Sequence, residues 1–298
     1  MATANNTILI FGCGYLGHRT AKLWQAAGHD VHAVTRSPAR SDEFRRQGLK
    51  GTVADVTSPE SLSHLPVAET VLFAVGFDRS TGGDIRTVYA TGLENVLAAL
   101  SPTVKRFIYI STTGVYGPAS GEWVDESTPP DPQRDGGRAS LAAEKILAAH
   151  PLGRRSVILR LAGIYGPGRV PYLDKLRAAE PLAVPSSGWL NLIHVDDAAR
   201  IVVAADQWAA SSQTRNDGPH VFCVSDGTPV ARRDYYAEVA RVIGAPTPAF
   251  CTPTENSPAA ARAASDRRVS NEKMSRTLGV ELQYPSYREG LAAILGTG

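Results

Sequence analysis

The chain has 298 residues, of which 43% are hydrophobic and 20% charged, and this ordinary composition excludes wholesale disorder. A formal net charge of +2, from 31 basic and 29 acidic residues, gives no reason to expect a nucleic-acid partner. No apolar run reaches the ~18 residues that cross a bilayer, and the first residues do not resemble a signal peptide. The widely spaced Cys13, Cys223 and Cys251 argue against a disulfide framework or a zinc site and fit a reducing cytoplasm.

Apolar runs of strand length alternate with segments of helical periodicity through the first two-thirds of the chain. Strands are expected at 7–12, 30–37, 51–56, 69–76, 105–117 and 156–166, and helices at 15–28, 83–100 and 138–150. Strands that alternate with helices of this length form βαβ units and a parallel sheet. Later in the chain we expect helices at 195–210 and 232–245, a strand at 220–227 and a polar, looped stretch at 251–279.

These elements predict an α/β protein with a doubly wound, parallel-sheet Rossmann fold and a smaller C-terminal substrate lobe. The Rossmann domain would comprise residues 1–163 and 191–226, and the substrate lobe residues 164–190 and 227–298. Ligands of such sheets bind beyond the carboxyl ends of the strands, so we expect the substrate in a cleft at that edge.

The first βα turn reads G-C-G-Y-L-G at residues 12–17, which is the G-x-G-x-x-G pattern between a strand and a helix. Gly12 permits the tight turn, Gly14 lets the backbone approach a pyrophosphate, and Gly17 lets the helix pack close to the strand. The helix N-terminus then offers its N–H groups and the positive end of its dipole to phosphates. We expect the cofactor to contact Gly12, Gly14, Tyr15, Leu16 and Gly17; a purely structural glycine turn is the alternative.

The end of the second strand distinguishes NAD from NADP. An NAD site usually has a carboxylate about 20 residues beyond the glycines, where it bonds the ribose 2′-hydroxyl. Here the strand ends in Arg36 and Ser37, Arg40 follows, and no carboxylate is present. Because arginine offers a planar fork of donors to a 2′-phosphate, NADP is expected rather than NAD. The alternative for Arg36 is a solvated surface arginine.

The ends of the third and fourth strands complete the expected cofactor site. Asp55, at the end of the third strand, would bond the adenine amino group or instead cap the turn that follows it. Val75 and Gly76, at the end of the fourth strand, are expected to line the same site.

Four more segments resemble motifs of the extended short-chain dehydrogenase/reductase family, in its NAD(P)-dependent epimerase/dehydratase group. They are GLENVL at 92–97, STTGVYG at 111–117, RLAGIYGPG at 160–168 and NLIHVDDAA at 191–199. In this order, and together with the glycine loop, they cover nearly the whole chain. The resemblance implies an NAD(P) cofactor, a small-molecule substrate and a homodimer packed through the fourth and fifth helices.

The departures from the family pattern concern its chemistry. In the family, a Tyr-x-x-x-Lys pair on the helix after the fifth strand supplies the acid/base and holds the nicotinamide ribose. Aligning the family's L-x-x-E-x-x-L pattern on 141–147 puts Gly136 at the tyrosine position and Ser140 at the lysine position. The family asparagine of the fourth helix falls at Tyr89, and that of the junction after the sixth strand at Gly163. The chain is therefore similar to atypical members.

Thr112 keeps the serine/threonine place that, by the resemblance, holds the substrate oxygen. A proton donor must come within about 3 Å of that oxygen. Tyr165, at the carboxyl end of the sixth strand, is the first substitute acid, and a packing role in the turn is its alternative. Lesser candidates for catalysis or for orienting the substrate are Tyr116, Lys145, His194, Asp78 and Arg79.

The first prediction is therefore an NADP(H)-dependent atypical short-chain dehydrogenase/reductase that transfers a hydride to or from a small carbonyl or alcohol substrate. Two alternatives stay open, a sugar-nucleotide epimerase or dehydratase and a non-catalytic dinucleotide-binding sensor or scaffold. No metal is expected, because the sequence has no metal-ligand spacing.

Overall fold

The computed structural model describes residues 6–78, 80, 82–211, 218–255, 257, 260 and 266–296, so Arg79 and parts of 251–279 lie outside the described residues. Contacts divide the chain into two compact units. The first contains Met1–Val115, Asp135–Arg160 and Ala199–Phe222, and the second Tyr116–Arg134, Leu161–Ala198 and Cys223–Gly298. No helix in the described part of the chain is long and apolar enough to cross a membrane.

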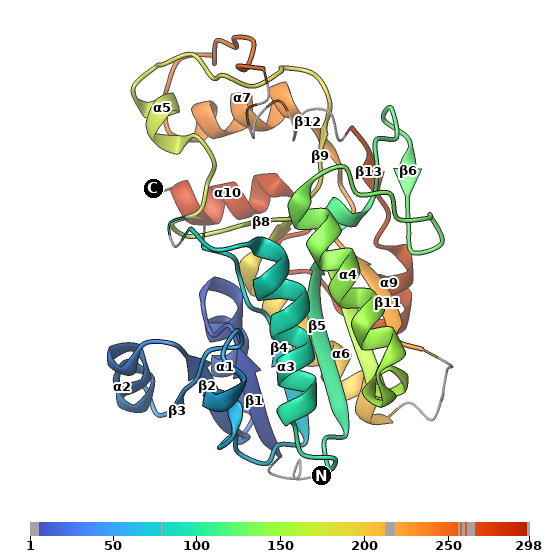
Figure 1. Ribbon diagram of the computed structural model, residues 1–298. Helices are drawn as coiled ribbons and strands as arrows, with labels where there is room; N and C mark the ends of the chain where they lie inside the picture. Colours follow the sequence, from blue (N-terminus) through green and yellow to red (C-terminus); the bar gives the residue numbers. More distant parts are fainter. Residues whose placement is uncertain are drawn as a thin grey trace. The chain divides into compact units, whose positions relative to one another are not determined.

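The first unit consists of a sheet with helices on both faces (Figure 1). Its strands are β1 (Thr7–Phe11), β2 (Asp30–Thr35), β3 (Lys50–Val53), β4 (Thr70–Phe73), β5 (Arg106–Thr112), β7 (Ser156–Leu161) and β11 (His220–Val224). Its helices are α1 (Tyr15–Ala26), α2 (Pro38–Arg46), α3 (Gly92–Ala99), α4 (Asp135–Ala149) and α6 (Val195–Ser211), the last of which begins in the second unit. Short helical turns are η1 (Pro59–Leu62), the π-helical η3 (Thr87–Thr91), η4 (Thr113–Val115) and η5 (Pro151–Arg155).

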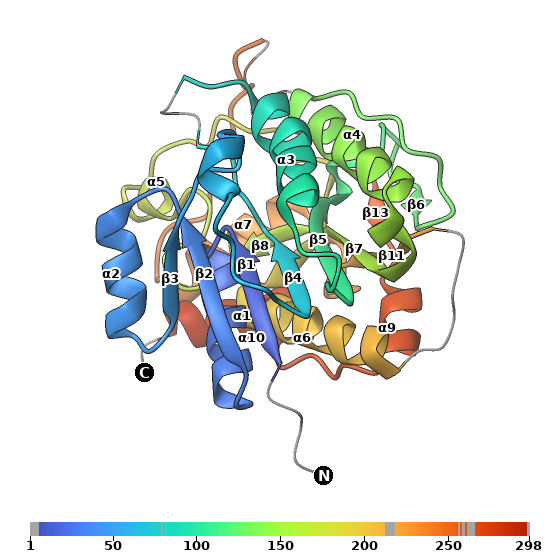
Figure 2. The same ribbon diagram turned by 60° about the horizontal axis from the view of Figure 1, so that its bottom comes forward.

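The sheet has the strand order β11-β7-β5-β4-β1-β2-β3, and Figure 2 shows these strands side by side. β1 pairs in parallel with both β2 and β4, so the chain proceeds outward in one direction from β1 and then returns to build the other half. This reversal defines a doubly wound fold and confirms the predicted fold class.

Side chains on the two faces of the sheet hold the helices in place. Leu9, Val71 and Phe107 belong to a buried cluster that includes residues of α3 and α4, so these two helices cover that face. On the other face Asp206 of α6 accepts hydrogen bonds from Thr70 (2.9 Å) and Arg106 (2.6 Å). Figure 2 shows α1 and α6 on this second face.

The described part of the second unit contains short strands, short helices and a core rich in tyrosine. Its strands are β6 (Trp123–Val124), β8 (Gly163–Tyr165), β9 (Trp189–Leu190), β10 (Leu192–His194), β12 (Val230–Ala231) and β13 (Arg268–Val269). Its helices are α5 (Leu173–Arg177), α7 (Arg232–Val242), α9 (Glu272–Leu278) and α10 (Tyr287–Leu295). Tyr165, Tyr235 and Leu291 are buried in its core.

Two segments differ from the expected domain boundaries because of their hydrogen-bond partners. Residues 116–134 contain β6, which pairs with β13, and residues 191–198 contain β10, which pairs with β8. Both pairings lie within the second unit, although the sequence placed these segments in the Rossmann domain.

Two expected elements also differ, and one helix appears that was not expected. The strand expected at 156–166 ends at Leu161, and β8 follows as a separate strand that pairs elsewhere. The stretch 251–279, expected to be looped, contains β13 and α9. Helix α2 was not expected, although Ser37 caps its N-terminus and Pro38 occupies its first turn, which is a recognisable start signal.

Candidate functional site

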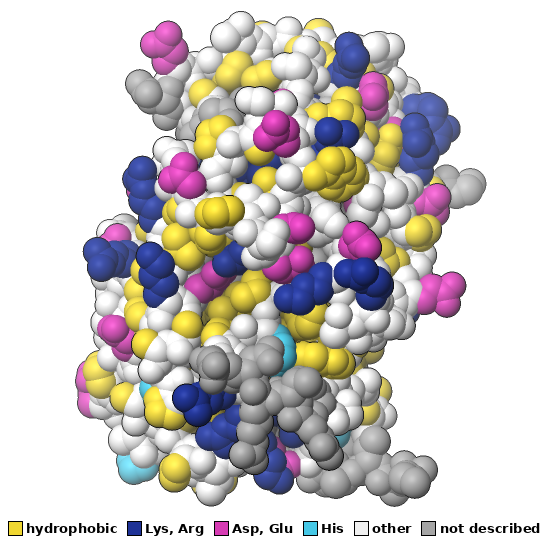
Figure 3. Space-filling model, turned by 90° about the vertical axis from the view of Figure 1, so that its right-hand side faces the viewer, with side chains coloured by type: hydrophobic (Ala, Val, Ile, Leu, Met, Phe, Trp, Pro, Cys, Tyr) yellow, Lys and Arg dark blue, Asp and Glu magenta, His cyan; other side chains and the backbone are white. Residues whose placement is uncertain are grey.

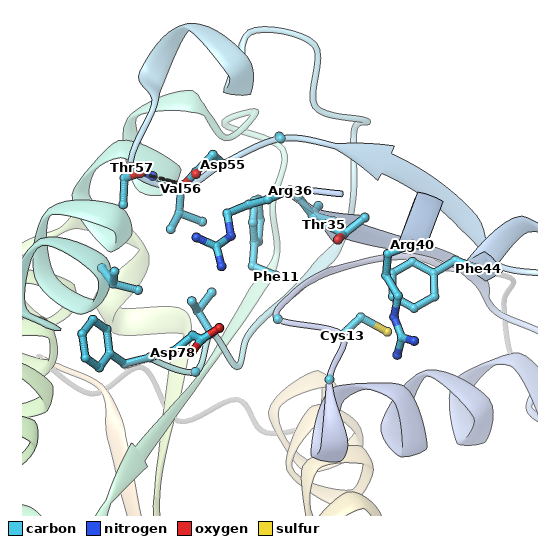
Figure 4. A pocket seen from close by; sticks show the side chains of 18 residues that line it. Phe11, Cys13, Thr35, Arg36, Arg40, Phe44, Asp55, Val56, Thr57 and Asp78 are labelled. Carbon is cyan, nitrogen blue, oxygen red and sulfur yellow. Dashed lines mark hydrogen bonds between the residues drawn. The ribbon is translucent and has the colours of Figure 1, made fainter. Parts of the chain in front are cut away.

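A pocket of the first unit lies at the carboxyl ends of β1 to β4 (Figure 4). Its volume is about 280 Å³, at the lower end of the range for small-molecule sites. Ligands of open parallel sheets bind at this edge, where the strand order reverses, which here is between β1 and β4. The fold therefore places the pocket where a ligand is expected.

The glycine turn forms one wall of the pocket. Gly12 has φ = +85°, and a side chain there would collide with the carbonyl oxygen of Ala74. A Cβ at Gly17 would collide with the carbonyl oxygen of Gly12, so this glycine keeps α1 close to β1. At Gly14, by contrast, an added Cβ meets nothing within 4 Å. The turn therefore needs two of its glycines for packing and leaves the third facing open space.

The N-terminus of α1 points its backbone toward this open space. Gly14 is the N-cap, so no side chain caps the helix, and its first turn has no acidic residue. The N–H groups of Leu16 and Gly17 have no acceptor within the helix, as in the first turn of any helix. An anion there would receive these donors and the positive end of the helix dipole. The turn therefore fits the pyrophosphate of a dinucleotide.

The predicted loop residues beyond Gly14 do not line the pocket with their side chains. The ring of Tyr15 lies under the guanidinium of Arg19 at 4.4 Å. Leu16 is buried in the core. A cofactor would therefore contact this part of the loop through its backbone.

The two arginines predicted to bind a 2′-phosphate both line the pocket. Arg36 follows β2, and its exposed guanidinium points into the pocket (Figure 4). Arg40, on α2, pairs with Glu43 at 2.7 Å and lies over the ring of Phe44 at 5.1 Å. Ser37 does not line the pocket, because its hydroxyl accepts a hydrogen bond from the N–H of Arg40 and caps α2.

The residues predicted after β3 and β4 also line the pocket. One carboxylate oxygen of Asp55 accepts hydrogen bonds from the N–H and the hydroxyl of Thr57, both at 2.8 Å, so the side chain is held in a fixed turn (Figure 4). The two roles expected for Asp55 are therefore compatible, because the second oxygen is not used by this turn. Val75 and Gly76 form the β4 side of the pocket.

Asp78 faces Arg36 across the pocket (Figure 4). Hydrogen bonds from the hydroxyl and N–H of Ser80 hold the pKa of this carboxyl below its usual range, and the positive charge of Arg36 adds to the effect. Cys13 also lines the pocket, but burial raises the pKa of its thiol to about 12. It is therefore not a nucleophile at neutral pH.

Thr112 lies half-buried at the carboxyl end of β5, outside this pocket. Its hydroxyl oxygen accepts a hydrogen bond from the N–H of Gly114 at 3.0 Å. The hydroxyl hydrogen is donated to no described residue. Thr112 can therefore donate a hydrogen bond to a substrate oxygen.

The helix that would hold the family's tyrosine and lysine, α4, packs differently here. Among the described residues, a Cβ at Gly136 would meet only Ile85 within 4 Å, at 3.7 Å, so this position is nearly empty. Ser140 is buried, with 3% of its surface exposed. One turn further on, Glu144 is buried with Arg160 (2.6 Å) and Ser111 (2.5 Å). At Ser140, the position of the family's lysine, the side chain of α4 therefore packs inside the protein.

The structure does not support Tyr165 as the substitute acid. The side chain is only 1% exposed, and its hydroxyl donates a 3.3 Å hydrogen bond to the carbonyl oxygen of Ser286. Its ring packs edge-on against His194, and burial raises the pKa of the phenol well above its usual range. Gly290 approaches so closely that a Cβ there would collide with the phenol. The alternative role of packing residue fits these contacts.

Of the lesser candidates, Asp78 lines the pocket, whereas Tyr116, His194 and Lys145 do not. Tyr116 is buried, with its hydroxyl 3.0 Å from the sulfur of Cys223. His194 is buried in the second unit, and Lys145 is exposed on α4. Phe77 and Val88, which sequence reasoning missed, do line the pocket. Val88 lies in the π-helical turn η3 and Phe77 in the irregular stretch after β4, and apolar spacing locates neither.

The described residues contain no group of three or more His, Cys, Asp or Glu side chains that could hold a metal ion. Basic and acidic side chains are interspersed over the face shown in Figure 3, in keeping with a net charge close to zero.

The fold, the glycine turn and the pocket at the switch point define a dinucleotide-binding protein of the Rossmann class. The family model for the NAD dependent epimerase/dehydratase family matches residues 8–218, and the chain belongs to this family. This confirms the resemblance to the extended short-chain dehydrogenases/reductases.

Individual relatives span nearly the whole chain. Protein YeeZ of Escherichia coli K12 is 30% identical over 284 residues, which cover 93% of this chain and 96% of YeeZ. The 3-diazoavenalumate denitrifying reductase of a Streptomyces species is 26% identical, with 95% and 98% covered. A solved structure of a conserved protein of unknown function from Silicibacter pomeroyi is 29% identical, covers 98% of both chains and has a TM-score of 0.76.

Proposed function

We propose that this protein is an NADP(H)-dependent oxidoreductase that transfers a hydride to or from a small carbonyl or alcohol substrate. The observation that carries this proposal is the convergence of three features on one pocket: the glycine turn, the N-terminus of α1 and the guanidinium of Arg36. Together they match the pyrophosphate and the 2′-phosphate of NADP(H).

Each part of the pocket suits a different part of the cofactor. The backbone from Gly12 to Gly17 would hold the pyrophosphate, and Arg36 would bind the 2′-phosphate, with Arg40 nearby. Asp55, whose carboxylate is already oriented by Thr57, would accept a hydrogen bond from the adenine amino group. Val75 and Gly76 would form the apolar wall of the adenosine site.

The bound reduced cofactor supplies the hydride, and the chain has to orient the substrate and stabilise its oxygen. Thr112 is placed at the carboxyl end of β5 with a hydroxyl hydrogen to donate, so it would polarise the carbonyl. Such a donor strengthens its hydrogen bond as negative charge develops on the oxygen, which lowers the barrier to hydride transfer. The relative with a reductase name agrees with this direction of chemistry.

A non-catalytic dinucleotide sensor is the second candidate, and one observation favours it. The positions of the family's tyrosine and lysine are Gly136, which is nearly empty, and Ser140, which is buried. An epimerase or dehydratase is disfavoured by the same observation, since those reactions need a strong base at this place.

A reductase assay separates these candidates. Protein freed of nucleotide is mixed with NADPH and a panel of small aldehydes and ketones, and loss of the NADPH absorbance is followed. We expect turnover with part of the panel, and Thr112→Ala should lower kcat by about 100-fold. The control is Thr103→Ala, an exposed threonine before the amino end of β5, which should behave as wild type. Tight NADPH binding without turnover of any carbonyl would favour the sensor.

A further inference from the structure

Tyr89, in the first unit, stands where the family resemblance places an asparagine. It lies in η3, the π-helical turn that precedes α3, and it is half-buried. π-helical turns are rare in proteins, and those that occur are often found at functional sites. Its neighbour Val88 lines the pocket.

A hydrogen bond fixes the hydroxyl of Tyr89 at the edge of the pocket. The backbone N–H of Phe77, a pocket residue, donates to the phenol oxygen at 3.2 Å. The phenol hydrogen is donated to no residue that the structure describes. The hydroxyl is therefore held as an acceptor from the backbone while its proton stays available.

The register of the sheet brings this hydroxyl to the same edge as Thr112. Phe73 of β4 pairs with Tyr109 of β5. Phe77 and Thr112 are four and three residues further along their segments, so both follow the carboxyl ends of neighbouring strands. Parallel strands lie about 4.8 Å apart. The hydroxyl bonded to Phe77 and the hydroxyl of Thr112 thus belong to one region of the sheet edge.

The turn that carries Tyr89 also packs beside the places of the missing tyrosine and lysine. A Cβ at Gly136 would lie 3.7 Å from Ile85, which is four residues before Tyr89. Helix α4, which carries Gly136 and Ser140, packs against η3, the turn that carries Tyr89. Burial raises the pKa of the neighbouring Tyr109, and Glu144 and then Tyr89 add to the effect.

We infer that the Tyr89 hydroxyl is the proton donor of the proposed reduction, in place of the tyrosine absent at position 136. In this step the carbonyl carbon gains a C–H bond from the hydride of NADPH, and the C=O π electrons move to oxygen. That oxygen takes the Tyr89 proton, NADP⁺ and the alcohol are the products, and the phenolate regains a proton from solvent. The N–H of Phe77 stabilises the negative charge left on the phenol oxygen.

This inference rests on the proposed function, and its test has a readout other than turnover. If Tyr89 lies at the nicotinamide, the positive charge of NADP⁺ should stabilise its phenolate, whereas neutral reduced nicotinamide should not. The ultraviolet absorbance of tyrosinate is titrated with pH in the complexes with NADP⁺ and with NADPH. We expect one tyrosine to ionise at least roughly one pH unit lower with NADP⁺.

Two variants assign the signal. Tyr89→Phe should abolish the difference between the two complexes, whereas Tyr172→Phe, which changes a half-buried tyrosine of the second unit, should retain it. Normal NADPH affinity of Tyr89→Phe shows that the variant is folded. Any carbonyl that the wild type reduces should be turned over about 100-fold more slowly by Tyr89→Phe. The assignment of Tyr89 would be overturned if both cofactors bind but the pH of tyrosine ionisation is the same in the two complexes. It would also be overturned if the difference between the complexes remains in Tyr89→Phe. Failure to bind either cofactor would instead overturn the proposed function.

Discussion

Arg36 and Asp78 face one another across the pocket from the ends of β2 and β4 (Figure 4). The hydrogen bonds from Ser80, and then the charge of Arg36, keep the pKa of Asp78 low, so the carboxylate is ionised at neutral pH. Its negative charge opposes the positive potential that Arg36 brings to the pocket. Within this pair, Arg36 therefore attracts a 2′-phosphate and Asp78 repels it.

Replacing Asp78 by Asn should tighten NADPH binding a few-fold and leave NADH binding nearly unchanged, because only NADPH carries the 2′-phosphate. The amide oxygen of Asn can still accept the hydrogen bonds from Ser80. Titration calorimetry with both cofactors measures the change, and low salt enlarges it. Weaker binding of both cofactors would mean instead that the Asp78 carboxylate contacts the ribose.

Two glycines of the turn should respond differently to alanine. Gly12→Ala forces a side chain against the carbonyl of Ala74 at φ = +85°, so we expect a loss of several kcal/mol of stability or failure to fold. Gly14→Ala meets no atom within 4 Å and should keep a near-normal Tm, but its methyl group occupies the approach of the pyrophosphate. Differential scanning fluorimetry with and without NADPH distinguishes the two. Normal cofactor binding by Gly14→Ala would contradict the placement of the pyrophosphate.

Asp226 should make the stability of the protein depend on pH. It is 6% exposed, and burial raises the pKa of its carboxyl to about 7. The unfolded chain has an ordinary aspartate pKa of about 3.9. The folded state therefore binds more protons between these values, and stability falls as pH rises from about 4 to about 7.

Asp226→Asn removes this titration while its amide oxygen still accepts the 2.9 Å hydrogen bond from the N–H of Thr228. The Tm of the variant relative to wild type should rise between about pH 4 and about pH 7. A Tm difference that is constant over this range would show that Asp226 is not protonated in the folded protein.

Tyr165→Phe tests whether Tyr165 is a packing residue and not the substitute acid. The substitution removes one long hydrogen bond to Ser286 and keeps the ring against His194. We expect about 1 kcal/mol loss of stability and no change in NADPH affinity or turnover. Loss of turnover at an unchanged Tm would restore Tyr165 as a candidate acid.

The parts of the fold predicted from sequence are those with a strong local signal. The strand, glycine turn and helix from Thr7 to Ala26 lie where the pattern put them, because the close approach of Gly12 and Gly17 to backbone atoms admits no other residue. Helix α2 was missed because it has little apolar periodicity, although Ser37 and Pro38 mark its start. The elements of the second unit were harder to predict from the sequence. Two-residue strands such as β6 and β13 exist because they pair with each other, and neither has a recognisable sequence pattern of its own.

Residues of the candidate site that follow a strand could be predicted from the sequence. Residues whose position depends on other features of the fold could not. Arg36, Asp55 and Val75 follow strands, so the edge of the sheet brings them together. Tyr165 was expected at the carboxyl end of the strand 156–166, but the chain leaves the sheet at Leu161 and buries this tyrosine. The place of Tyr89 depends on a π-helical turn, which hydrophobic spacing does not reveal.

The central claim is that the pocket binds NADP(H) through Arg36. Titration calorimetry of nucleotide-free protein with NADPH and NADH, on wild type and Arg36→Ala, tests it most directly. We expect wild type to bind NADPH at least tenfold more tightly than NADH, about 1.4 kcal/mol, and Arg36→Ala to lose that preference. Equal affinity for the two cofactors, or a preference that survives in Arg36→Ala, would contradict the claim.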